Sequence, residues 1–215
     1  MPRLYKLLAY SYAGVKDTSS AIQYMNQYLL NVADSNHLTK HYELMADMYA
    51  ASEDKKDSAM IFYRKILEKN EDSTRNYVYY KKLAGLARQL KDYAAHADLL
   101  GKYYQSYKNA SKLDLFNWGI AHFKAEEYPQ ADSVFTLYSE KYPEQSYGYY
   151  WRARSNALMD STMETGSAIP HYKQLITVIE KDTSDATNKK SMIKAYGYIA
   201  AYETNKEMNY ENDII

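Results

Sequence analysis

Between Leu115 and Pro143, the sequence places large apolar residues and two very small ones at helical spacing on either side of a polar turn. Two antiparallel helices approach closely only where one of them lacks a bulky side chain, and Gly119 and Ala131 supply such positions. Pro143 ends the second helix because it has no amide proton to donate. The stretch therefore predicts a hairpin of two packed helices. Its signature positions are Trp118, Gly119, His122, Tyr128, Ala131, Phe135, Tyr138 and Pro143.

The same spacing recurs along the chain. In the expected second helices the close-contact positions are separated by 38, 37, 35 and 37 residues, and they are Ala21, Ala59, His96, Ala131 and Ala168. In the expected first helices the intervals are 37, 38 and 35, between Ala9, Ala46, Ala84 and Gly119. Ala97 can take the contact role beside His96. Two independent periods predict a stack of helical hairpins that bury each other's faces.

These positions resemble the signature of the tetratricopeptide repeat, in which a large residue, Leu-Gly and a tyrosine precede alanine, phenylalanine, alanine and proline. Trp118, His122 and Tyr138 depart from that pattern. The resemblance implies an all-α fold, a right-handed α-α superhelix of about five and a half hairpins. One array over 1–215 is expected, as a piece of a longer chain, with repeats at 2–35, 39–73, 76–110, 111–145, 146–183 and, in part, 187–215.

The stretches KDYAAHADLL, EEYPQADSVF and GYYWRARSNALMD are similar to bacterial multi-repeat proteins of the cell envelope. This resemblance favours the periplasm or envelope, with the cytoplasm as the alternative. In the fifth repeat the close contact of the first helix falls at either Ser155 or Ala153, and the two registers stay open.

Composition excludes several classes of function. The 27 basic and 27 acidic residues balance, and the lysine pairs are scattered, so no nucleic-acid partner is expected. The chain has no cysteine, which excludes disulfides and thiolate chemistry. No apolar run approaches the roughly 18 residues of a membrane span. Tyrosine is unusually frequent, with 26 residues, and either packs the flanks of the hairpins or lines an aromatic groove for a ligand.

The motifs of catalysis are missing from the sequence. The seven glycines are isolated, so no phosphate-binding loop is expected. His37 and His41 lie four apart, but no acidic residue completes a metal site, and they are interpreted as a solvated helix start. His96 and His122 are expected to be partly buried and hydrogen-bonded, and His171 exposed. We therefore predict no enzyme activity, no metal and no cofactor.

In the tetratricopeptide family the first helices line the concave face, so the resemblance implies a partner site there. The corresponding residues are Lys6, Tyr10, Glu43, Asp47, Lys81, Gly85, Arg88, Phe116, Ile120, Phe123 and Lys124. Phe116, Ile120 and Phe123 form either an exposed binding patch or a stripe buried by the neighbouring helices.

Three functions follow as alternatives. The first is a protein-interaction scaffold that binds a protein or peptide segment in the concave groove. The second is an assembly segment that stacks on further repeats or on a second copy, since neither Leu4–Tyr12 nor Tyr196–Ile215 has the polar face of an end cap. The third is a glycan or small-ligand binder that uses tyrosine rings.

Overall fold

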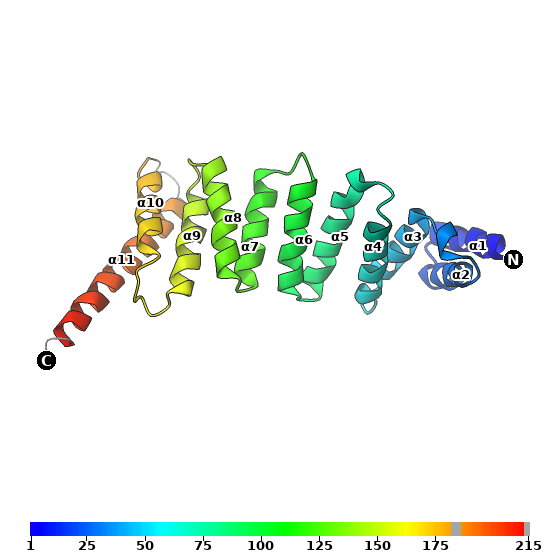
Figure 1. Cartoon of the computed structure of the whole chain (residues 1–215), viewed down its shortest axis with the longest axis horizontal. Coiled ribbons are helices and arrows are strands. Elements are labelled where there is room, and N and C mark those ends of the chain that lie inside the picture. Colours follow the sequence, from blue (N-terminus) through cyan, green and yellow to red (C-terminus); the bar gives the residue numbers. More distant parts are fainter. Residues whose placement is uncertain (182–185, 213–215) are drawn as a thin grey trace. The chain divides into compact units, whose positions relative to one another are not determined.

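The computed structural model describes residues 1–181 and 186–212. Within these residues there are eleven α-helices, two short 3-10 helices and no β-strand, which confirms the predicted all-α class (Figure 1). The predicted repeats 146–183 and 187–215 end on residues outside the described ones.

The chain forms two compact units, Met1–Lys108 and Asn109–Ile215. Unit 1 comprises α1 (Pro2–Gly14), α2 (Thr18–Leu30), α3 (Thr39–Ala50), α4 (Lys56–Lys69), α5 (Asn76–Gln89) and α6 (Tyr93–Ser106). Unit 2 comprises α7 (Lys112–Lys124), α8 (Tyr128–Lys141), α9 (Ser146–Met159), α10 (Ile169–Ile179) and α11 (Ala186–Asn212). The single array over 1–215 stays a prediction.

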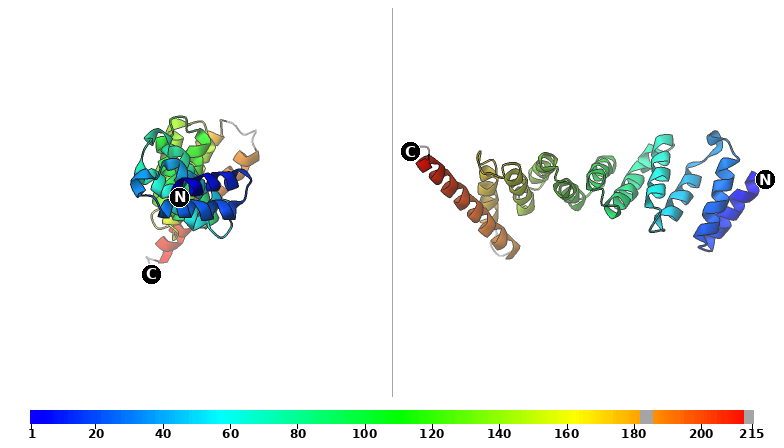
Figure 2. Two further views of the ribbon diagram at one scale, coloured as in Figure 1. Left: turned by 90° about the vertical axis from the view of Figure 1, so that its right-hand side faces the viewer. Right: turned by 90° about the horizontal axis from the view of Figure 1, so that it is seen from below.

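Within each unit the odd-numbered helices are the first helices of the hairpins and the even-numbered ones are the second helices. Each first helix packs on the second helix of its own hairpin and on that of the preceding hairpin (Figures 1 and 2). The exceptions are α1 and α7, which begin their units, and α11, which packs on α10. The hairpins are therefore layers of one stack inside each unit.

The small residues lie where the helices meet. All of the predicted close-contact alanines are essentially inaccessible to solvent: Ala9, Ala21, Ala46, Ala59, Ala84, Ala131 and Ala168. Ala97 is fully buried while His96 is only half-buried, so Ala97 takes the contact role in the third hairpin. Ala153 and Ser155 are both fully buried, so burial leaves the two registers of the fifth hairpin open.

Three of the hairpin turns share one backbone conformation. Lys16, Lys91 and Glu126 adopt left-handed φ angles of 63°, 61° and 61°. An acidic residue follows each of them, and in two cases its carboxylate caps the next helix: Asp17 accepts from the Ser20 amide and Asp92 from the Ala95 amide. These caps satisfy amides that the first helical turn leaves unpaired. The α8 helix ends at Lys141, just before Pro143, as predicted.

Most of the aromatic side chains in the core are tyrosines. Among the residues whose burial is described, eight tyrosines are less than 10% exposed, namely Tyr28, Tyr42, Tyr63, Tyr79, Tyr103, Tyr138, Tyr149 and Tyr172. Their rings pack inside while several of their hydroxyls reach polar partners at the edge, as with Tyr63 on Asp47. Tyrosine therefore suits a thin structure in which few positions are far from water.

The last helix is a single element of 27 residues. It includes the predicted sixth-repeat residues Tyr196, Gly197 and Ala200, all of them exposed. None of the helices in the described part of the chain combines the length and the hydropathy that crossing a bilayer would require.

Candidate functional site

The predicted acidic residues of unit 1 lie in a polar network between three helices. Glu43 on α3 accepts from the Tyr79 hydroxyl and lies 3.5 Å from the Arg75 guanidinium. Asp47, one turn later, accepts from the Tyr63 hydroxyl and pairs with Lys82 Nζ at 2.7 Å. Burial, and next the bond to Glu43, raise the pKa of Tyr79 to about 12. Both carboxylates are therefore matched by groups of unit 1 itself.

Two of the three predicted cations of unit 1 lie over aromatic rings. Lys6 Nζ is 5.6 Å from the centre of the Tyr28 ring, and Lys81 Nζ is 4.9 Å from that of Tyr103. Tyr10 donates its hydroxyl hydrogen to the Lys40 carbonyl at 3.3 Å, and burial raises its pKa. Arg88 is exposed. The first-helix surface of unit 1, meaning the outward side chains of α1, α3 and α5, therefore keeps its positive charges accessible.

In unit 2 the predicted apolar trio is half-buried rather than exposed. The Phe116 ring centre lies 5.9 Å from that of Phe135 and 5.8 Å from that of Tyr138, both on α8. The Phe123 ring makes an edge contact with Trp151 on α9 at 4.8 Å. These contacts agree with the second alternative, in which neighbouring helices cover much of the stripe. Lys124 remains exposed beside it.

A cluster that the sequence analysis did not single out adjoins this stripe. Arg154 on α9 lies 4.8 Å from the Trp151 ring centre, 5.0 Å from Phe123 and 5.8 Å from Tyr150. Lys194 on α11 donates to the Tyr150 hydroxyl at 3.0 Å. The charge of α9 could have indicated this cluster from the sequence, because the helix holds two arginines and no acidic residue.

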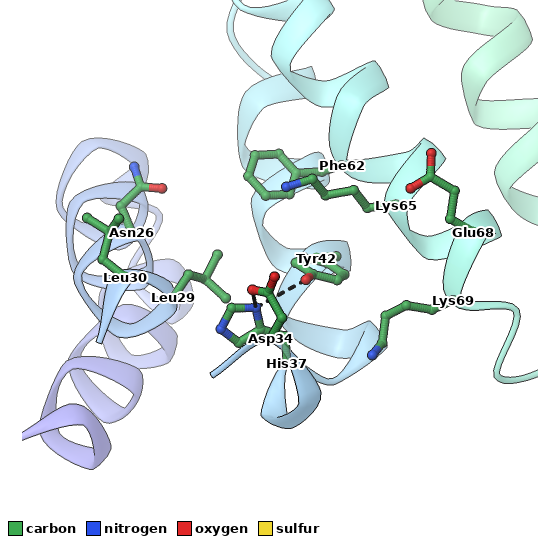
Figure 3. Close-up of a pocket in the computed structure, with 10 residues that line it drawn as sticks. All are labelled: Asn26, Leu29, Leu30, Asp34, His37, Tyr42, Phe62, Lys65, Glu68 and Lys69. Atoms are coloured by element: carbon green, nitrogen blue, oxygen red, sulfur yellow. Dashed lines mark hydrogen bonds and ion pairs between the residues drawn. The ribbon is translucent and has the colours of Figure 1, made fainter. Parts of the chain in front are cut away.

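A groove of about 560 Å³ lies on the second-helix side of unit 1 (Figure 3). Leu29 and Leu30 of α2 form one wall, and Phe62 of α4 and Tyr42 of α3 form the other. The charges that line it balance, because two lysines, Lys65 and Lys69, accompany two acids, Asp34 and Glu68. The groove can take an apolar side chain, but its balanced charge selects no ligand.

The interpretation of His37 and His41 as a solvated helix start is wrong. Their exposed fractions are 4% and 0%, and the Tyr28 ring of α2 packs against both imidazoles, with centre distances of 6.4 Å to His37 and 4.8 Å to His41. His37 at the base of the groove lies 3.1 Å from the Tyr42 hydroxyl and from Asp34, and 2.9 Å from the Val32 carbonyl. His41 Nδ1 accepts from the Leu38 amide, and its Nε2 has no hydrogen-bond partner among the residues that the structure describes. Burial, and next the charge of Lys6, lower the pKa of His41 to about 4.

The predictions for the other three histidines are confirmed for two and wrong for one. His96 lies 2.9 Å from the Ala84 carbonyl, and His122 accepts from the Trp118 indole and contacts Glu127 at 2.6 Å, so both are hydrogen-bonded as predicted. His171 is half-buried rather than exposed, and burial lowers its pKa. No cluster of three potential metal ligands occurs among the described residues.

The fold resembles that of several solved structures. The C-terminal part of a TPR repeat-containing protein from Cytophaga hutchinsonii matches 100% of this chain over 80% of its own length, at 24% identity and a TM-score of 0.55. MamA AMB-1 matches 86% of this chain over 93% of its own, at 17% identity and a TM-score of 0.50. The complex of the TPR2AB domain of yeast Sti1 with pHSP90 matches 95% of this chain over 86% of its own length, at 14% identity and a TM-score of 0.40.

No protein-family model and no curated protein matches the sequence. The likeness to solved structures is one of architecture, since the identities are low. It agrees with the buried close-contact alanines and with the helical hairpins of both units. The chain therefore has the fold of tetratricopeptide-repeat proteins.

Proposed function

We propose that the chain is a protein-interaction scaffold that binds a segment of a partner protein on its first-helix surfaces. In unit 1 this surface is the one defined above. In unit 2 it is formed by outward side chains of α7, α9 and the described part of α11. Of the predicted residues, Lys6, Tyr10, Lys81, Arg88 and Lys124 stay available for contact, and Glu43 and Asp47 position cations beside them.

The observation that carries the proposal is the row of aromatic rings on α7 and α9 that remains partly open to solvent. Phe116, Phe123 and Trp151 are half-buried, and Tyr147, whose ring lies 6.1 Å from that of Phe116, is 41% exposed. Partly exposed aromatic rings bordered by cations are typical of surfaces that bind protein segments. The proposal assigns no catalysis and no cofactor.

A peptide-display selection on the whole chain tests this function. Selected peptides should lose about tenfold in affinity when Lys81 and Arg88 are both changed to glutamate, or when Tyr147 is changed to alanine. All three side chains are exposed, so helical content measured by circular dichroism should not change. The matched control is Arg64→Glu with Lys102→Glu, which makes the same charge reversal on the second helices α4 and α6. Equal effects of both reversals, or no selected peptide, would contradict the proposal.

An assembly role is the second candidate, and the outer face of α11 favours it. Ile193 is 72% exposed and Tyr196 51%, and a Cβ on Gly197 would meet no atom within 4 Å. In α7 the equivalent glycine, Gly119, is covered by the Phe135 ring of a second helix. Gly197 is thus a small residue of the kind that is typical of a helix-packing position, but no helix among the described residues packs against it.

If this face mediates association, the chain should form larger species as its concentration rises. The change of Ile193 and Tyr196 to aspartate and serine should then lower the weight-average mass measured by light scattering to that of the monomer. Both side chains are exposed, so the variant should keep its thermal midpoint. A wild-type mass that stays monomeric at all concentrations would exclude the assembly role for this chain.

A further inference from the structure

Charge is distributed unevenly over α9 and the adjoining part of α11. The chain as a whole is neutral, yet α9 carries Arg152 and Arg154, and residues 186–202 carry Lys189, Lys190 and Lys194. Neither stretch contains an aspartate or a glutamate. These two stretches therefore supply five cations and no counter-charge, whereas acidic residues of α11 follow them at Glu203 and Glu207.

Two of these cations share one aromatic ring. The Arg154 guanidinium carbon lies 5.8 Å from the centre of the Tyr150 ring, and Lys194 Nζ lies 5.5 Å from it. Over the described part of the chain, neither cation has a carboxylate within ion-pair distance. Arg152 differs, since its Nε pairs with Asp132 at 3.1 Å. The position around Tyr150 therefore has positive charge that the fold does not neutralise.

The aromatic rings hold the arginine in place without cancelling its charge. Besides Tyr150, Arg154 contacts the faces of Trp151 at 4.8 Å and Phe123 at 5.0 Å. Cation–π contacts orient a guanidinium but leave its net charge and its hydrogen-bond donors available. Since like charges near one ring repel, a carboxylate between them removes an unfavourable interaction as well as forming two ion pairs.

We propose that Tyr150, Arg154 and Lys194 bind the carboxylate of an acidic side chain in the partner segment, next to which Phe123 and Trp151 contact apolar atoms. Lys194 is exposed and Arg154 and Tyr150 are half-buried, so an incoming chain can reach them. The inference rests on the proposed scaffold function and specifies the chemistry of its ligand. A nucleic acid is disfavoured because its phosphates call for an extended basic track, and the whole chain carries equal numbers of acids and bases.

The test uses the whole chain and peptides from an unbiased display library. Peptides selected on the wild type should be enriched in aspartate or glutamate. When the acidic residue of such a peptide is changed to its amide, fluorescence anisotropy should show a loss of about tenfold in affinity. The Arg154→Gln, Lys194→Gln double variant should lose about as much and should no longer distinguish the acid from the amide. The control, Lys141→Gln with Lys173→Gln, removes the same charge from the second helices and should still distinguish them.

Each other outcome has a separate meaning. Peptides that bind the wild type and the double variant equally, with no acidic preference, would overturn the carboxylate position while leaving the scaffold function intact. No selected peptide would overturn both. A labelled oligothymidylate that binds the wild type more tightly than the peptides do, and loses affinity in the double variant, would replace the acidic protein segment with a nucleic acid.

Discussion

Alanine in place of Gly119 is expected to lower the free energy of unfolding by about 2 kcal/mol. A Cβ at this position in α7 would lie 2.7 Å from Cζ and 2.8 Å from Cε1 of Phe135. Phe135 is fully buried, so its ring cannot move without disturbing the packing of α8. Overpacking of a core by one methyl group costs up to about 3 kcal/mol, and the better helix propensity of alanine returns about 1 kcal/mol. Urea denaturation followed by circular dichroism measures the difference.

Gly197→Ala is the matched control in the same unit. A Cβ there meets nothing within 4 Å, so only helix propensity changes, and the variant should gain about 0.5 to 1 kcal/mol. Combining Gly119→Ala with Phe135→Leu should recover part of the loss, because a smaller side chain makes room for the methyl group. If Gly119→Ala were as stabilising as Gly197→Ala, the close approach of α7 and α8 would not be as the structure describes it.

Acidification is expected to destabilise the protein through His41. Because the folded state lowers the pKa of this histidine from 6.5 to about 4, the unfolded chain binds a proton that the folded chain does not, between these two values. The contribution of His41 to the free energy of unfolding is therefore fully present above pH 6.5 and is lost as the pH drops towards 4. With allowance for screening of the partly polar surroundings, His41 should account for about 2 kcal/mol of the loss.

His41→Gln separates this effect from the titration of carboxylates. Glutamine at the third position of a helix can accept from the same Leu38 amide that His41 Nδ1 now satisfies, and it does not titrate. Urea midpoints of the two proteins should diverge between pH 6.5 and 4, with the wild type losing more. Parallel curves over that range would mean that His41 takes up its proton equally well in the folded and unfolded chains.

Much of the fold could be predicted from the sequence, whereas the candidate site could be predicted only in part. Helix positions followed from the spacing of small residues, and the buried alanines from Ala9 to Ala168 confirm that spacing. The first-helix residues Lys6 and Lys81 were named from the resemblance, but their contacts with Tyr28 and Tyr103 come from neighbouring second helices. For Phe116 and Phe123 two alternatives stayed open, because the sequence of one helix does not show how closely the neighbouring helix covers it.

The sequence alone determined the all-α class, the hairpins and their closest contacts. The reason is that the spacing of apolar and small residues within a helix indicates which of its faces is buried. Tertiary structure decided which polar groups meet. Lys194 reaches the Tyr150 hydroxyl across 44 residues of chain, and His37 and His41 are buried where the Tyr28 ring of α2 packs against them. Such contacts depend on how separate helices stack, and that is not encoded in the spacing within any single helix.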